Sequence, residues 1–97
     1  MQDGAFSWHD RKAAANPRNH GGVTFEQAKA VFRDVLADEV EDDREDYGET
    51  RFNLTGRDAN NNLLVVTYTV RGTLKHIISA RKATLNERNE FYARLGF

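Results

Sequence analysis

The chain has 97 residues, with fourteen Lys and Arg, fifteen Asp and Glu, and no Cys. This length predicts a single domain that buries roughly 60–65% of its unfolded surface. The lack of cysteine excludes disulfides and thiolate metal sites, and it suits a reducing compartment. No apolar run approaches the roughly 20 residues of a membrane span, and the first residues lack the features of a secretory signal. We therefore expect a cytoplasmic protein.

Charge is unevenly distributed along the chain. Residues 38–49 hold eight acidic side chains and one arginine, a net charge of −7, so the remainder carries +6. A basic body of this kind attracts phosphate backbones. The acidic run could lie over the basic surface, repel nucleic acid locally or be solvated, and solvation is the commonest fate of such a run.

The first half of the chain predicts a short strand and two helices. Residues 6–8 alternate apolar and polar like a strand, and residues 11–16 form an alanine-rich helix that Pro17 is expected to break or kink. Thr24 and Gln27 make a capping box for the second helix. Its apolar residues recur at helical spacing over about three turns, and they are Phe25, Ala28, Val31, Phe32 and Val35.

The second half predicts a sheet. Residues 51–55 alternate like a strand, and residues 63–70 and 74–80 form a hairpin. A three-residue loop of Arg71, Gly72 and Thr73 segregates the two faces better than a two-residue Arg-Gly turn. In this register His76 lies opposite Tyr68 on the apolar face.

The chain ends in a helix over residues 85–95, which follows a capping box of Thr84 and Glu87. Together these elements predict an α+β fold with two N-terminal helices, an antiparallel sheet of three to five strands and a C-terminal helix.

The junction between the last strand and the last helix is a candidate phosphate site. Arg81 and Lys82 lie just before the capping box. A helix start presents free backbone N–H groups and the positive end of the helix dipole to an anion. Two cations beside such an end predict phosphate binding, and the alternative is that both are solvated charges at the end of a strand.

Several familiar catalytic signatures are missing. The sequence has no Gly-rich phosphate loop, no His-Glu-x-x-His pair and no Gly-x-Ser-x-Gly elbow. The three histidines match no recognised spacing of metal ligands, so no metal site is expected.

RNA cleaves itself once its 2′-OH is aligned with the neighbouring phosphate. A protein can assist by positioning, charge neutralisation and proton transfer, without a metal or cofactor.

Segments along nearly the whole chain resemble the BrnT family of bacterial toxins. In the front half they are Phe6-Ser7-Trp8, Lys12-Ala13 with Asn16, His20-Gly21, Val23 to Ala28, and Val31-Phe32. In the back half they are Glu49-Thr50-Arg51, Gly56, Leu64 to Thr69, Arg71, and Ile77 to Thr84 with Glu87-Arg88. The run Ile-Ile-Ser-Ala-Arg-Lys-Ala-Thr is quite specific to that family.

The resemblance implies a RelE-like fold and a ribonuclease toxin of a type II toxin–antitoxin pair. It also implies a BrnA-type antitoxin partner with a ribbon-helix-helix DNA-binding part, in a complex that represses its own operon. The RNA substrate would then be the ligand of the basic side chains, with operator DNA bound through the antitoxin complex.

Arg81 is the first candidate for stabilising transition-state charge, and Arg71 at the hairpin turn is the second. About ten residues, or roughly 30 Å of strand, separate them. We therefore expect that only one reaches the scissile phosphate and that the other contacts RNA or is structural. His76 and His20 are candidate general acids or bases, and the alternative for His76 is a packed, hydrogen-bonded histidine.

The expected RNA contacts are basic side chains and one aromatic ring. Trp8 could stack on a base, although core packing is the alternative, and Arg51 should lie at the Arg71 end of the sheet. The full set is Lys12, Arg51, Lys75, Lys82 and Trp8.

Three features depart from the family pattern. An extra glycine, Gly22, lengthens the turn between the first two helices, and two positions change a basic residue. Asn19 stands where a basic residue usually precedes His-Gly, and His76 stands where an arginine usually opens the Ile-Ile-Ser-Ala-Arg segment. Because both changes remove or soften a cation, they motivate a second hypothesis. The chain would then be a degenerate, non-catalytic toxin that binds an antitoxin and acts as a co-repressor.

Overall fold

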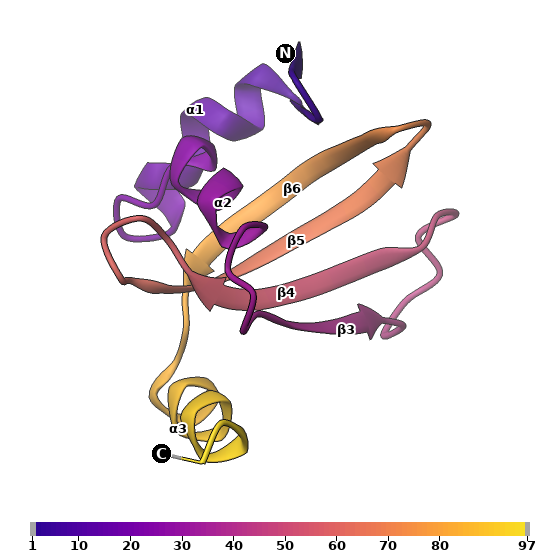
Figure 1. The fold of residues 1–97 in the computed structure, drawn as a ribbon. Coiled ribbons are helices and arrows are strands. Elements are labelled where there is room, and N and C mark those ends of the chain that lie inside the picture. The colour runs from indigo at the N-terminus through magenta and orange to yellow at the C-terminus, as the bar shows by residue number, and fades with distance from the viewer. Residues whose placement is uncertain (1, 97) are drawn as a thin grey trace.

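Six strands form a single sheet in the order β1-β2-β6-β5-β4-β3, in a computed structural model that describes residues 2–96 (Figure 1). Only the β2–β6 pair is parallel among the pairs described. None of the described helices is long and apolar enough to span a membrane. The elements are β1 (Gln2–Asp3), β2 (Phe6–Trp8), α1 (Asp10–Asn19), α2 (Phe25–Val31), β3 (Asp38–Asp42), β4 (Arg51–Arg57), β5 (Leu63–Arg71), β6 (Leu74–Lys82) and α3 (Leu85–Arg94).

The predicted α+β class is confirmed, with two helices before the main strands and one after them. The sheet differs from the expected antiparallel sheet of three to five strands, because it has six strands and β2 pairs with β6 in parallel. The core lies between α2 and one face of the sheet, and it contains Phe25, Ala28 and Val31 from α2 with Leu64 and Val66 from β5. The third helix lies on the face of the sheet opposite α2, and it is well separated from both N-terminal helices in Figure 1. There its buried Phe91 and Val65 of β5 line the same groove.

Pro17 does not break α1, contrary to expectation. The side chain of the preceding Asn16 is buried, with the residue 4% exposed. Its Nδ2 donates to the carbonyls of Val23 and Ala80 at 2.7 Å each, and its Oδ1 accepts from the Ala80 N–H at 3.2 Å. These bonds hold the end of α1 on β6, and Pro17 removes only one intrahelical donor near that end.

The second helix is shorter than its apolar pattern predicts. Both halves of the predicted capping box form, but the helix ends at Val31 and the Val35 side chain is 95% exposed. The Asp34 carboxylate accepts hydrogen bonds from the backbone N–H groups of Leu36 and Arg57, at 3.0 and 2.8 Å. These bonds turn the chain toward the sheet, so the assignment of Val35 to the apolar stripe is wrong.

The acidic run is not a single loop. Its first part forms β3, an edge strand that pairs with β4 from Asp38 opposite Thr55 to Asp42 opposite Arg51. Charged side chains on such an edge discourage pairing with another chain. Asp42 is buried, and hydrogen bonds from Arg44 lower the pKa of its carboxyl to about 2.

The β5–β6 register differs from both hairpin turns weighed in the sequence analysis. Arg71 pairs with Leu74, which leaves a two-residue turn whose Gly72 has a φ of 62°, as tight hairpin turns require. A bulge then shifts the pairing, because Tyr68 lies opposite Ile77 whereas Thr67 lies opposite Ser79. His76 consequently lies opposite Thr69 rather than Tyr68.

Candidate functional site

Four strands align polar side chains in one row across the sheet. Ser7 of β2 pairs with His76 of β6, His76 pairs with Thr69 of β5, and Thr69 pairs with Arg51 of β4. Directly paired residues share a face, and Thr69 faces away from the core side of its neighbour Tyr68. The row therefore lies on the face opposite α2, toward the hairpin end of the strands.

A hollow of about 300 Å³ opens beside this row. Its basic side chains converge from α1 and three strands, and Ile78, the residue left unpaired by the bulge, borders it. The lining residues are Trp8, His9, Lys12, Glu49, Arg51, Arg71, His76 and Ile78. The prediction that Arg51 lies at the Arg71 end of the sheet is confirmed.

A second hollow of about 220 Å³ continues along α1. It shares Lys12 and Ile78 with the first, and it adds His20 and Asn19. The fold therefore brings the predicted residues Lys12, Arg51, Arg71 and His76 around one hollow, with His20 in the adjoining one.

Glu49 lies between the two arginines of the first hollow. Its Oε1 is 3.4 Å from Arg71 Nη2, and its Oε2 is 3.6 Å from Arg51 Nε. The Arg51 guanidinium also stacks on Tyr47, 4.0 Å from the ring centroid. The sequence reasoning missed Glu49 and Tyr47 because it treated the acidic run mainly as solvated. The spacing of Glu49 and Arg51 was an available signal, because residues two apart on an extended chain share a face.

Among the described residues, His76 makes one side-chain hydrogen bond. Its Nδ1 lies 2.9 Å from Ser7 Oγ, and among the described residues its Nε2 has no hydrogen-bond partner. Burial, together with the positive charge of Arg71, lowers the pKa of His76 below its ordinary value of 6.5. The imidazole is therefore neutral at pH 7 and able to accept a proton.

Arg81, the first catalytic candidate, is engaged in a structural contact at the other end of the sheet. It donates two hydrogen bonds to Glu87, at 2.6 and 2.9 Å. This contact lowers the pKa of Glu87 to about 2 and raises that of Arg81. Thr84 and Glu87 also complete the predicted capping box, so backbone N–H groups at this helix start already have partners. Arg81 is therefore not a free cation.

The surroundings of Arg81 are not basic. The adjacent groove of about 230 Å³ contains the acids Asp38, Glu87 and Glu90 beside Arg81 and Arg94. Lys82 is exposed at the end of β6, opposite Leu64. The structure thus separates Arg81 and Lys82 from the hollow that contains Arg71.

Two other predicted RNA contacts lie on the core side. Trp8 borders the first hollow but is only 7% exposed, and its ring packs edge-on against Phe25 with centroids 5.9 Å apart. Lys75 Nζ lies 5.8 Å from the centroid of the Phe32 ring. Core packing, the alternative for Trp8, accounts for its position.

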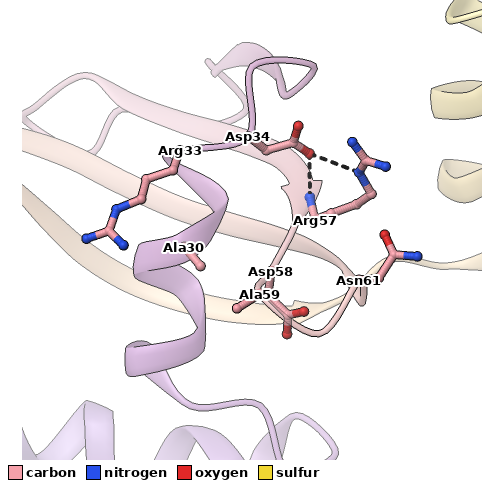
Figure 2. Close-up of a pocket in the computed structure, with 7 residues that line it drawn as sticks. All are labelled: Ala30, Arg33, Asp34, Arg57, Asp58, Ala59 and Asn61. Atoms are coloured by element: carbon pink, nitrogen blue, oxygen red, sulfur yellow. Dashed lines mark hydrogen bonds and ion pairs between the residues drawn. The ribbon is translucent and has the colours of Figure 1, made fainter.

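A hollow of about 370 Å³ between the end of α2 and the β4–β5 loop is built from structural contacts (Figure 2). Asp34 accepts from Arg57, and Asp58 accepts from the backbone N–H groups of Asn60 and Asn62. Burial alone would raise the pKa of both carboxyls, but these hydrogen bonds outweigh it and both pKa values are lowered. Asp34 thus stabilises the turn after α2, and Asp58 stabilises the β4–β5 loop.

Comparisons with known proteins identify the family and agree with the fold. A family model described as the ribonuclease toxin BrnT of type II toxin–antitoxin systems matches residues 8–87. The fold is similar to the 1.1 Å crystal structure of the Brucella abortus ribonuclease toxin BrnT, with a TM-score of 0.63 and 18% identity over 81% of this chain and 95% of that chain. No curated protein matches the sequence. Because the family model spans most of the chain, the chain belongs to the BrnT family of type II toxin–antitoxin ribonuclease toxins.

Proposed function

We propose that this chain is a metal-independent endoribonuclease that acts as a single toxin domain in the bacterial cytoplasm. The observation that carries the proposal is the hollow where Arg51, Arg71, Lys12 and His76 converge. Arginine suits a scissile phosphate because its planar fork bonds two oxygens at once. The family supports ribonuclease activity, and the shared sheet and core support a single domain.

The reaction needs positioned cations and one proton acceptor. Arg51 and Arg71 bind the scissile phosphate and neutralise the pentavalent phosphorane. His76 accepts the 2′-OH proton through Nε2 as O2′ forms a bond to phosphorus and the bond from phosphorus to O5′ breaks. The leaving O5′ takes a proton from water or from Lys12. The products are a 2′,3′-cyclic phosphate and a 5′-OH.

Growth arrest tests the site. Expression of the chain alone should stop bacterial growth, and Arg71→Ala should relieve the arrest, since loss of such a contact slows chemistry by about 10²–10³. Arg81→Ala is the matched control, because it removes an arginine from the same sheet but outside the hollow. A harmless wild-type chain whose purified form leaves RNA intact in EDTA would refute the proposal.

We further propose that a BrnA-like antitoxin with a ribbon-helix-helix part neutralises the chain. The type II setting of the family supports a protein antitoxin. Co-expression with the neighbouring gene should restore growth, and the purified complex should shift operator DNA in a gel. Failure of that gene product to bind the chain would remove this part of the proposal.

A second candidate function is that of a non-catalytic co-repressor. Two observations favour it: Glu49 lies against both arginines of the hollow, and Asn19 and His76 depart from the basic residues of the family pattern. In that case the antitoxin complex would shift operator DNA while the free chain cleaved no RNA. Cleavage by the free chain would exclude this candidate.

A further inference from the structure

Arg51 has a buried nitrogen without a hydrogen bond. Among the described residues its Nε finds no acceptor within bonding geometry, although Glu49 Oε2 lies 3.6 Å away. Buried polar groups are usually hydrogen-bonded, and an unpaired one calls for an explanation such as an absent ligand. Here the unpaired atom is a charged donor at the edge of a basic hollow.

Glu49 is held more loosely by its arginines than Glu87 is held by Arg81. Its two contacts, at 3.4 and 3.6 Å, exceed the 2.7–2.9 Å typical of charge-assisted hydrogen bonds. By contrast, Arg81 binds Glu87 at 2.6 and 2.9 Å. The Glu49 carboxylate therefore occupies the space between two arginines without bonding well to either.

The two arginines extend from neighbouring strands on the same face of the sheet. Arg51 lies opposite Thr69 on the adjacent strand, and Arg71 is two residues further along that strand, so both side chains leave the same face roughly 7 Å apart along it. Tyr47 stacks on the Arg51 guanidinium and restrains its plane. The oxygens of a phosphate are arranged tetrahedrally, so one phosphate can contact both guanidinium groups. A planar carboxylate has only two oxygens to divide between the two arginines.

We propose that the space between Arg51 and Arg71, here named the phosphate seat, binds one backbone phosphate of RNA, and that Glu49 occupies it in the free protein. This inference rests on the proposed function, because it assigns a regulator to the same hollow. RNA binding must separate Glu49 from both arginines, so Glu49 competes with the substrate phosphate. One part of the acidic run thus lies over the basic surface rather than being merely solvated.

Binding to an RNA that cannot be cleaved tests the seat without requiring activity. The probe is a fluorescent single-stranded RNA with 2′-O-methyl riboses, measured by anisotropy with the full chain. We expect Glu49→Gln to bind the RNA about fivefold more tightly than Glu45→Gln does. This factor is at the upper end of what an exposed ion pair contributes. Both variants remove one negative charge from the same segment, but Glu45 is exposed and has no partner among the described residues.

A second measurement links the effect to the arginines. Inorganic phosphate should displace the RNA from Glu49→Gln at a lower concentration than from wild type. Adding Arg71→Gln to Glu49→Gln should remove the gain in RNA affinity. Glu49→Ala serves as a second variant, and thermal melts confirm that each variant is folded. The inference would be overturned if Glu49→Gln bound the RNA no more tightly than Glu45→Gln, or more weakly than wild type.

The same variants separate the two proposals. If Glu49→Gln binds more tightly but no variant cleaves ordinary RNA, the phosphate seat stands and the nuclease proposal fails. If the wild-type chain cleaves RNA but Glu49→Gln gains no affinity beyond its control, the nuclease proposal stands and the seat fails.

Discussion

Replacing Asn16 by alanine should destabilise the protein more than any exposed substitution on the same helix. The change removes three hydrogen bonds to Val23 and Ala80, each contributing about 1 kcal/mol net. It also leaves buried groups of Ala80 without a partner, so the expected loss is about 2–4 kcal/mol. For a domain of this size that loss lowers the melting temperature by roughly 10–25 °C.

Urea denaturation followed by circular dichroism measures this loss directly. Asn19→Ala is the matched control, because it makes the same change at an exposed position of the same helix, where the effect should stay within about 0.5 kcal/mol. If Asn16→Ala were no less stable than Asn19→Ala, the anchoring of α1 on β6 by this side chain would be refuted.

Three further predictions concern packing and pH. Gly56→Ala should cost about 1–3 kcal/mol in urea denaturation, because its new Cβ would lie 2.9 Å from Ala37 Cβ, and unchanged stability would contradict this contact. Because the folded pKa of Glu87 is lowered to about 2 from 4.5, its pairing with Arg81 stabilises the fold above pH 4.5 and loses this effect as the pH falls toward 2. The difference in melting temperature between wild type and Glu87→Gln should therefore shrink over that range, and a difference independent of pH would argue against the pairing. Cleavage that uses neutral His76 should rise with pH and reach half its plateau below pH 6.5, and a midpoint above 6.5 would exclude this role.

Local sequence signals predicted much of the fold. The capping boxes at Thr24 and Thr84 fixed the starts of α2 and α3, and both form. The ends of elements were less predictable, because they depend on tertiary bonds. After α2 ends at Val31, the Asp34 carboxylate binds the Arg57 backbone and turns the chain toward the sheet. Asn16 holds the end of α1 despite Pro17 through a strand 64 residues away.

The hairpin register shows why periodicity alone misplaced a site residue. The apolar pattern of both strands fits more than one pairing, and a bulge at Ile78 changes which residues face the core halfway along β6. His76 consequently moves from the apolar face, where the pattern placed it, to the row that contains Arg51. No regular period in the sequence encodes such an insertion.

The site was predictable in its residue types but not in its grouping. Arg71, Arg51, Lys12 and His76 were recognised as separate cations and titratable groups, and only the topology of the sheet brings them together. Arg81 stood out because it precedes a helix start. The sequence does not reveal that the capping residue Glu87 also bonds the Arg81 guanidinium with both carboxylate oxygens.

The most direct test of the proposed active site is the rate of RNA cleavage by purified protein in EDTA. We predict that the wild-type protein cleaves single-stranded RNA and that Arg71→Ala lowers the cleavage rate by about 10²-fold or more. Folded Arg81→Ala should cleave at a rate within about threefold of wild type, which corresponds to a change of less than about 1 kcal/mol in the activation barrier. A preparation in which Arg81→Ala loses activity while Arg71→Ala retains it would contradict the assignment of the active site to the hollow beside His76.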